Sequence, residues 1–319
     1  MRKIFKSKKR VILLIITILL FSGSIWQAIM VKKETATYKA VGQMVDVGSY
    51  QAHTYTKGEG EIAFVFITGS GTPCAYTDFY FLQSELSKLG QTISFDHAGS
   101  GWSTNATNDR SIDNLVIELS ALIDTLAGDK QVVLVCHSLG SLETIAYAQH
   151  SKERVKGIIC LDAGSPEYYE TLSELSSKVL NRSTALIRTI GINRAFGEVG
   201  FLLPLYGENT RYSKLPEEIR GVDKAMYNRL AGNSETLDNI SLINENAAEV
   251  LKGEKLGKIP LLVLSAESNK EWEEVQKQLT NWSEDSKQIT LTDSDHYIHW
   301  TNTEDVVKYM KEFVSDINE

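Results

Sequence analysis

The stretch QVVLVCHSLGSLETIAYAQ, residues 131–149, decides the fold. It begins with an apolar run typical of a buried strand and continues as a helix, with Ser138 at the corner between them. The corner is similar to G-x-S-x-G, the turn that presents a nucleophilic serine, although Cys136 stands where the first glycine is expected. The alternative is a core strand followed by a helix that happens to start near a serine. Ser138 is therefore a candidate nucleophile that needs support from the rest of the chain.

Strands and helices alternate on both sides of this stretch. A plausible hairpin turn at Gly48 and Ser49 joins two short strands within residues 38–57. Further strands are predicted from apolar runs typical of strands buried on both faces, at 61–67, 91–95, 155–161, 259–267 and 287–292. Alternation of this kind predicts an α/β protein with a mostly parallel central sheet and right-handed crossovers.

The alternation stops between residues 164 and 258, where the pattern is mostly helical. We expect this insertion (residues 164–258) to form a helical lid before the seventh strand, at the carboxyl edge where such sheets bind ligands. The core is then formed by residues 32–163 and 259–319. Apolar residues of the insertion favour a partly hydrophobic substrate, and the candidates for contacting it are Phe196, Phe201, Leu202 and Tyr206.

The N-terminal segment predicts a membrane anchor. Residues 1–10 hold six Lys and Arg and no acid, and residues 11–31 contain no charged residue. At about 1.5 Å per residue this apolar segment just spans a bilayer core of about 30 Å. The basic flank predicts a single-pass signal-anchor with residues 1–10 in the cytoplasm and the catalytic domain outside. The alternative is a signal peptide that is cleaved to release a secreted protein.

Charge, cysteine spacing and the glycine-containing segment at residues 96–103 argue against several classes of function. The chain beyond residue 10 carries 27 Lys and Arg against 41 Asp and Glu, and so acidic a body disfavours nucleic acid as a partner. The three cysteines lack metal-ligand or C-x-x-C spacing. The segment DHAGSGWS (residues 96–103) lacks both the dinucleotide fingerprint and the lysine of a phosphate-binding loop. We therefore expect no cofactor and no catalytic metal.

A nucleophilic serine needs a base, and the candidate lies near the C-terminus. In LTDSDHYIHW (residues 291–300) a strand is followed by a polar loop that carries His296. A histidine just beyond the last strand can reach the carboxyl edge above Ser138. We expect His299 to pack or to orient this loop, and His137 to point away from Ser138.

Five segments now resemble a known family by their order. ITGSG (67–71), DHAGSGWS, VCHSLGS (135–141), ICLDAGSPEYY (159–169) and DSDHYIHW (293–300) are similar to the motifs of the α/β-hydrolase superfamily, in particular its serine hydrolases. The resemblance implies the chain order nucleophile, acid, histidine. It also implies an oxyanion hole formed by the backbone N–H groups of Leu139 and Ser70, with Thr68 where the family often has histidine.

The acid is where this chain departs from the common family pattern. Most relatives place an aspartate after the strand that follows the lid, and Asn269 stands there, with Glu267 nearby. Some relatives, such as many haloalkane dehalogenases, place the acid at the end of the strand before the lid, where this chain has Asp162. An aspartate after so apolar a strand needs a partner if it is buried. Asp162 is the preferred acid, and Glu267 and Asn269 are the alternatives.

The residues and the resemblance together predict a serine hydrolase with Ser138, His296 and Asp162 as its triad. The expected reaction is cleavage of an ester, or a related acyl bond, of a partly hydrophobic small molecule through an acyl-enzyme. One alternative is a serine peptidase similar to prolyl aminopeptidases. Another is a non-catalytic hydrolase-fold protein that binds a partner at the membrane. Dehalogenase chemistry is disfavoured because that family uses an aspartate where Ser138 stands. The sequence does not predict an oligomeric state.

Overall fold

A computed structural model describes residues 2–198 and 208–318 of the 319-residue chain. Its centre is an eight-stranded sheet in the order β1-β2-β4-β3-β5-β6-β7-β8. The first two strands pair antiparallel and the other six run parallel, which confirms the predicted fold class. The strands are β1 (Gln43–Asp46), β2 (Gln51–Lys57), β3 (Ile62–Ile67), β4 (Gln91–Phe95), β5 (Gln131–His137), β6 (Val155–Leu161), β7 (Leu261–Ala266) and β8 (Ser286–Leu291).

Helices cover both faces of the sheet, so the central strands are mostly apolar, and β3 is apolar at every position. In β3, Phe64 and Phe66 belong to the core on one face, whereas Val65 and Ile67 belong to the core on the other. This alternation follows from the two-residue period of a strand. Outside the insertion, the helices that flank the sheet or lie in the segments that follow its strands are α2 (Ala75–Asp78), α3 (Tyr80–Leu86), α4 (Ile112–Ala127), α5 (Gly140–His150), α13 (Lys270–Thr280), α14 (Ile298–Thr301) and α15 (Thr303–Asp316).

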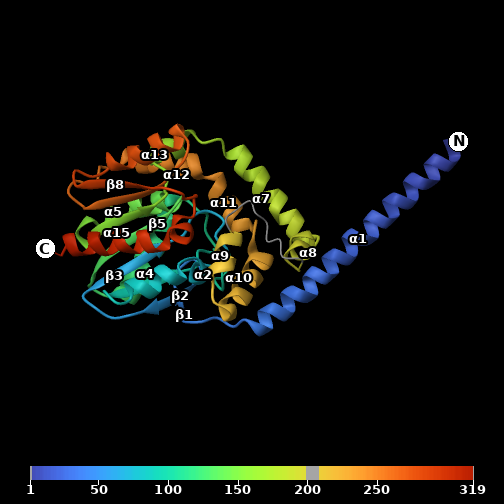
Figure 1. Ribbon diagram of the computed structural model, residues 1–319, viewed down its shortest axis with the longest axis horizontal. Helices are drawn as coiled ribbons and strands as arrows, with labels where there is room; N and C mark the ends of the chain where they lie inside the picture. Colours follow the sequence, from blue (N-terminus) through green and yellow to red (C-terminus); the bar gives the residue numbers. More distant parts are fainter. Residues whose placement is uncertain (1, 199–207, 319) are drawn as a thin grey trace.

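The insertion between β6 and β7 is helical in its described residues. Most of these helices lie beyond one end of the sheet, between the sheet and the projecting N-terminal helix (Figure 1), and the last of them packs against α5 and α4. They are α6 (Pro166–Thr171), α7 (Glu174–Thr189), α8 (Ile192–Glu198), α9 (Glu208–Lys214), α10 (Glu217–Leu230), α11 (Ser234–Ser241) and α12 (Ile243–Lys252). The insertion therefore covers the carboxyl edge of the parallel strands.

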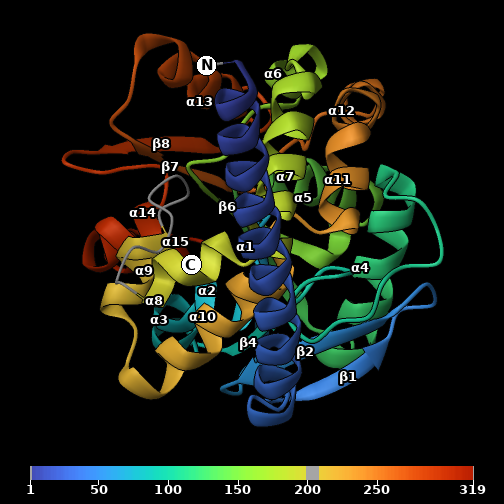
Figure 2. The ribbon, with the colours of Figure 1, turned by 90° about the vertical axis from the view of Figure 1, so that its right-hand side faces the viewer.

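The N-terminal helix α1 (Arg2–Thr37) projects from the body (Figure 1). Its stretch Lys8–Thr37 is long and apolar enough to cross a membrane, a test that a signal sequence also passes. The first part of this stretch is exposed, and the last part packs against α7 and α10 of the insertion. Figure 2 shows α1 running across the end of the molecule in front of these helices. The apolar segment is thus joined to the insertion and not to the sheet.

The corner between β5 and α5 requires small residues. Ser138 has a φ of +52°, a left-handed conformation that is uncommon for a residue with a side chain. A Cβ added at Gly140 would lie 2.9 Å from the carbonyl oxygen of Thr68 and 3.0 Å from that of Ile67. Cys136 is fully buried at the position of the missing glycine, with its sulfur 3.5 Å from that of Cys160. The helix start and the end of β3 therefore nearly touch at Gly140.

We expect Gly140→Ala to lower the free energy of unfolding by about 1–3 kcal/mol, because the added methyl group meets rigid backbone carbonyls. Gly157→Ala in β6 is the matched control, since its Cβ would meet only side-chain atoms of Phe313 and Ile317, which can shift. Chemical denaturation of the full chain in mild detergent measures both variants. Equal losses in the two variants would contradict this reading of the corner.

Candidate active site

Three polar side chains meet above the carboxyl edge of the sheet. Ser138 follows β5, Asp162 follows the neighbouring strand β6, and His296 lies in the loop between β8 and α14. These residues are far apart in the sequence, and they meet because the strands before them are parallel and end at the same edge. The structure therefore brings together Ser138, Asp162 and His296.

Their hydrogen bonds form one continuous chain. Nδ1 of His296 lies 2.6 Å from Oδ2 of Asp162, and Nε2 lies 3.0 Å from Oγ of Ser138. A carboxylate only accepts hydrogen bonds, so the Nδ1–H of His296 donates to Asp162. Nε2 is then free to accept the hydroxyl hydrogen of Ser138. A hydroxyl, an imidazole and a carboxylate in this order can activate the hydroxyl as a nucleophile.

Asp162 is a buried carboxylate whose oxygens are well supplied with donors. The backbone N–H of Ala266 donates to Oδ1 at 2.8 Å. The indole N–H of Trp272 lies 3.2 Å from Oδ1 and 3.1 Å from Oδ2. Asp162 also adopts a φ of +42°, and its own N–H donates to the carbonyl of Leu264. These contacts offset the cost of burying the charge and fix the carboxylate beside His296.

The two alternative acids have other partners. Oδ1 of Asn269 accepts from the backbone N–H of Trp272 at 3.0 Å, which makes Asn269 the N-cap of α13. The carboxylate of Glu267 accepts from the backbone N–H of Asp293 at 3.3 Å. Among the residues that the structure describes, the carboxylate recorded in contact with the imidazole of His296 is that of Asp162.

A cavity of about 740 Å³ lies between these residues and the insertion. We call it the Ser138 cavity. Ser70 and Leu139 line it together with Ser138 and His296, so their backbone groups lie on the same cavity wall as the serine. The insertion supplies the opposite wall. Its lining side chains include Tyr168, Tyr169, Leu172, Ser177, Leu180, Asn181, Thr184, Tyr227, Ile240 and Ile243.

Of the four insertion residues selected from the sequence, the structure describes Phe196 alone. Phe196 lies in α8 with 49% of its surface exposed, and it is absent from the described lining residues. Phe201, Leu202 and Tyr206 fall outside the residues that the structure describes. Apolar clustering alone selected these four, whereas the described lining residues of the insertion include members of α6, α7, α10, α11 and α12, where apolar and polar residues mix.

Trp272 and the N–H of Ala266 were missed by sequence reasoning. One signal was available, because Trp272 stands in the first turn of a helix that follows a strand ending at the same edge. Its indole N–H needs a partner when the ring packs near a buried carboxylate. A backbone donor such as that of Ala266 carries no sequence signal at all.

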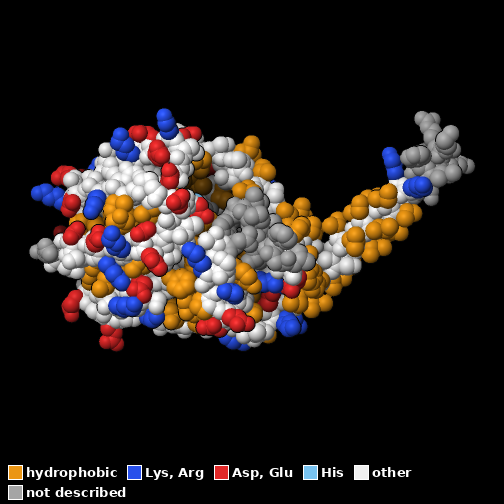
Figure 3. Space-filling view, viewed as in Figure 1, with side chains coloured by type: hydrophobic (Ala, Val, Ile, Leu, Met, Phe, Trp, Pro, Cys, Tyr) orange, Lys and Arg blue, Asp and Glu red, His pale blue; other side chains and the backbone are white. Residues whose placement is uncertain are grey.

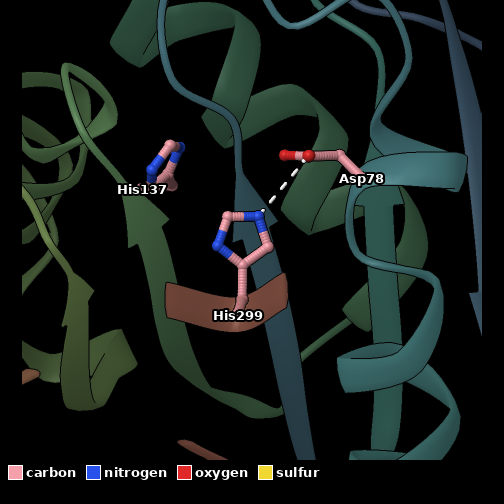
Figure 4. Close-up of side chains that lie close together, drawn as sticks. All are labelled: Asp78, His137 and His299. Atoms are coloured by element: carbon pink, nitrogen blue, oxygen red, sulfur yellow. Dashed lines mark hydrogen bonds and ion pairs between the residues drawn. The ribbon is translucent and has the colours of Figure 1, made fainter. Parts of the chain in front are cut away.

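Behind Ser138 lies a second cluster of buried polar side chains, formed by Asp78, His137 and His299 (Figure 4). Nε2 of His299 lies 3.4 Å from Oδ1 of Asp78. These three residues could in principle hold a metal ion. However, the guanidinium of Arg211 also lies 3.4 Å from Oδ1 of Asp78 and already compensates its charge, which disfavours a cation there.

This cluster supports the loop that carries His296. The Nε2–H of His137 donates to the carbonyl oxygen of His296 at 3.0 Å. Burial, with the neighbouring His296 and His299, holds the pKa of His137 well below its ordinary value of 6.5. For Asp78, burial opposes ionisation, but His299 and Arg211 outweigh it and hold the pKa well below the ordinary range. His137 is thus a neutral donor that positions the loop.

The segment DHAGSGWS has a structural role. Oδ1 of Asp96 accepts from the backbone N–H of Ala75 at 2.7 Å, and Oδ2 accepts from the ring of His53. The ring of His97 bridges the hydroxyl of Thr68 at 3.0 Å and the carboxylate of Glu143 at 2.7 Å. These contacts fix the loop after β3, which carries Ser70.

The alpha/beta hydrolase fold family matches residues 62–303, which include every strand from β3 to β8 and the loop of His296. The chain belongs to this family. The family membership, with the relatives that follow, makes the protein a hydrolase enzyme that acts on a small-molecule substrate.

Relatives of this hydrolase cover most of its length. The uncharacterized protein YbdG of Bacillus subtilis is 27% identical over 247 residues, which are 77% of this chain and 74% of that protein. The cis-3-alkyl-4-alkyloxetan-2-one decarboxylase of Shewanella oneidensis is 24% identical over 284 residues, 83% of this chain and 85% of that protein. A thermophilic esterase from Thermogutta terrifontis has the same fold, with a TM-score of 0.63 and 17% identity over 87% of this chain and 100% of its own.

We expect His137 to make this hydrolase less stable as the pH falls below 6.5. The unfolded chain binds a proton at His137 near that pH, but the folded chain does not until the pH reaches its depressed pKa. The contribution of His137 to the free energy of unfolding is therefore full above pH 6.5. Between pH 6.5 and the depressed pKa it falls by up to about 1.4 kcal/mol per pH unit. Urea titrations of His137→Gln in detergent should show a shallower pH slope than the wild type. An unchanged slope would contradict the burial of a neutral His137.

Proposed function

We propose that the protein is a serine hydrolase that cleaves carboxylic esters of partly hydrophobic small molecules. The observation that carries the proposal is the hydrogen-bonded chain from Ser138 through His296 to Asp162, with distances of 3.0 Å and 2.6 Å, at the wall of the Ser138 cavity. A serine of this kind, with a base in contact and an acid behind it, has the arrangement needed for nucleophilic catalysis.

In the proposed reaction, Oγ of Ser138 attacks the carbonyl carbon of the ester while Nε2 of His296 takes the hydroxyl proton. The C–O bond to the alcohol then breaks, and His296 returns the proton to the leaving oxygen, so an acyl-enzyme and the free alcohol result. Water, deprotonated by the same nitrogen, attacks the acyl carbon and releases the acid and Ser138. Asp162 stabilises the imidazolium that forms in both halves.

The oxyanion in this proposal is bound by the backbone N–H groups of Leu139 and Ser70. Leu139 directly follows the serine at the start of α5, where the first N–H groups have no acceptor within the helix and favour a nearby negative charge. Because the donors belong to the backbone, Thr68 at the position of the usual histidine does not remove one. Each donor of this kind typically contributes about 3 kcal/mol to stabilising the transition state.

Two observations favour a partly hydrophobic ester as the substrate. The cavity wall opposite Ser138 carries tyrosine, leucine and isoleucine side chains, with a few polar groups between them. An oxetan-2-one is a four-membered cyclic ester, and the Shewanella relative is named for one that bears two alkyl groups. The decarboxylation in that name is a second fate for such a carbonyl, and product analysis separates it from hydrolysis.

We also propose that the insertion acts as a lid and that α1 anchors the enzyme in a membrane. The anchor is supported by the uncharged segment at residues 11–31, flanked by Arg10 on one side and Lys32 on the other. The excess of Lys and Arg before the segment favours an extracytoplasmic catalytic domain. The insertion supplies lining residues of the Ser138 cavity, and most of its helices lie between the sheet and α1 (Figure 1).

Labelling with a fluorescent fluorophosphonate tests the nucleophile. We expect the wild type to be labelled and Ser138→Ala to lose both labelling and hydrolysis of p-nitrophenyl esters, because no other group replaces Oγ. Ser315→Ala, a serine on the exposed surface of α15, is the matched control and should behave as the wild type. Wild-type protein that neither labels nor hydrolyses any ester would favour a non-catalytic binding protein.

Substitution of Asp162, of its donor Trp272 and of the alternative residue Asn269 tests the role of Asp162. We expect Asp162→Asn to lower kcat by about 10⁴-fold, because an amide cannot stabilise the imidazolium and favours the wrong tautomer. Trp272→Phe, which keeps the bulk but removes one donor to the carboxylate, should lower kcat much less. Asn269→Ala should leave kcat near wild type and lower stability by about 1 kcal/mol through loss of the α13 cap. A larger kcat loss in Asn269→Ala than in Asp162→Asn would overturn the assignment.

A further inference from the structure

Helix α7 of the insertion has two distinct faces. Ser177, Asn181 and Thr184 line the Ser138 cavity. On the opposite face Leu175, Val179 and Leu186 are 71%, 56% and 60% exposed. We call these three residues the outer stripe. They recur at the spacing of a helix face, so α7 is a wall one helix thick between the cavity and the surroundings.

The outer stripe continues onto neighbouring elements. Ile192 and Phe196 of α8 are also exposed apolar side chains, and so are the side chains of α1 from Val11 to Phe21. Figure 3 shows hydrophobic side chains along the projecting part of α1 and on the adjoining end of the body. Arg182 lies within the stripe, and its long side chain can reach lipid headgroups from an interfacial helix.

The length of the apolar segment says where this face lies in a membrane. From Arg10 to Lys32 the helix rises about 33 Å, close to the thickness of a bilayer core. The exposed part that ends at Ser22 covers only about 18 Å of it. The remaining apolar turns already pack against the insertion. For residues 11–31 to span the core, the part of the insertion beside these turns must enter the outer leaflet.

The contact that fixes this depth is tight. A Cβ added at Gly23 would lie 2.2 Å from the carbonyl oxygen of Ile190, and one added at Gly191 would lie 2.6 Å from that of Gly23. Arg194 of α8 then binds Glu34 of α1 through two hydrogen bonds of 2.5 Å and 2.9 Å, and binds Gln27 at 2.8 Å. The turn between α7 and α8 is therefore held against the middle of the apolar segment, about 14 Å below Lys32 along the helix.

From these observations we propose that the outer stripe of α7, with the adjoining apolar residues of α8, lies in the outer leaflet of the bilayer, and that the Ser138 cavity takes its substrate from that leaflet. Helix α7 runs across the direction of α1 (Figure 1), so it would lie along the plane of a membrane that α1 crosses. Leu180 lines the cavity and is 45% exposed, so it stands at the edge between cavity and membrane.

The substrate class that fits this placement is an ester with a long alkyl chain. Such a molecule keeps its apolar chain in the leaflet beside the outer stripe of α7, and its carbonyl can enter the Ser138 cavity that this helix lines. The cavity of about 740 Å³ has room for the carbonyl and part of one chain. This second half of the inference rests on the proposed esterase function, whereas the position of α7 in the membrane does not.

A depth measurement tests the position of α7 without any need for activity. The native cysteines Cys74, Cys136 and Cys160 are buried, so a cysteine introduced at Leu186→Cys in the full chain takes a thiol-reactive nitrobenzoxadiazole dye selectively. In nanodiscs that contain lipids spin-labelled along the acyl chain, we expect strong quenching at this position. Ile117→Cys on α4, which is 62% exposed and remote from α1, is the control. Quenching at position 186 no greater than at position 117 would overturn the proposal.

Activity in the same nanodiscs tests the substrate route. We expect the triple variant Leu175→Ser, Val179→Ser, Leu186→Ser to lose about tenfold or more in kcat/KM toward a long-chain glycerol ester placed in the bilayer, because polar residues weaken interfacial docking. Its kcat/KM toward a water-soluble p-nitrophenyl acetate should stay near wild type, as should both activities of Ile117→Ser. Equal losses on both esters, or none on the bilayer ester, would overturn the route. A wild type inactive on both would refute the esterase function and the route that rests on it, leaving α7 to the depth measurement.

Discussion

The buried carboxylate of Asp162 is the point on which the arrangement of this site depends. A charge removed from water needs donors on several sides, and here they come from different parts of the fold: the N–H of Ala266 at the end of β7, the indole of Trp272 in α13, and the ring of His296 after β8. Each donor belongs to an element that follows Asp162 in the chain. The carboxylate thus ties the second half of the core to the first, and the ring of His296 is oriented as one part of that network.

A second constraint acts at the corner of Ser138. The strained serine can sit above the sheet only if α5 starts almost in contact with the end of β3, and Gly140 permits that approach. The first small position of the motif need not be glycine, because the compact side chain of Cys136 is fully buried in the core beside Cys160. The unusual residue at this position therefore does not disturb the geometry that presents the hydroxyl.

Much of this architecture could be predicted from the sequence because periodicity and order carry it. Runs such as IAFVFI predict strands buried on both faces, and their alternation with helical patterns predicts an α/β protein. The sheet of the structure confirms that class. The meeting of Ser138, Asp162 and His296 follows from strand ends that share an edge. The lining contributed by the insertion could not be predicted, since apolar character alone does not tell a lining side chain from an exposed one such as Phe196. The N–H of Ala266 was beyond reach because a backbone donor carries no sequence signal, and the contact of Trp272 was indicated only by its place in the first turn of α13.

The hydrogen bonds from Arg194 to Glu34 and Gln27 have a practical consequence for the preparation of a water-soluble form of this enzyme. Shortening the chain to begin at Lys32, the usual way to remove an apolar leader, would keep Glu34 but delete Gln27 and Gly23. Arg194, buried in the full chain, would lose one partner, and the helical turn bearing the other would start at a frayed end. Asn228 would also lose the amide that donates to its carbonyl. The shortened protein would keep its sheet and the side chains of Ser138, Asp162 and His296. The insertion that covers them would pack less tightly where it contacts α1.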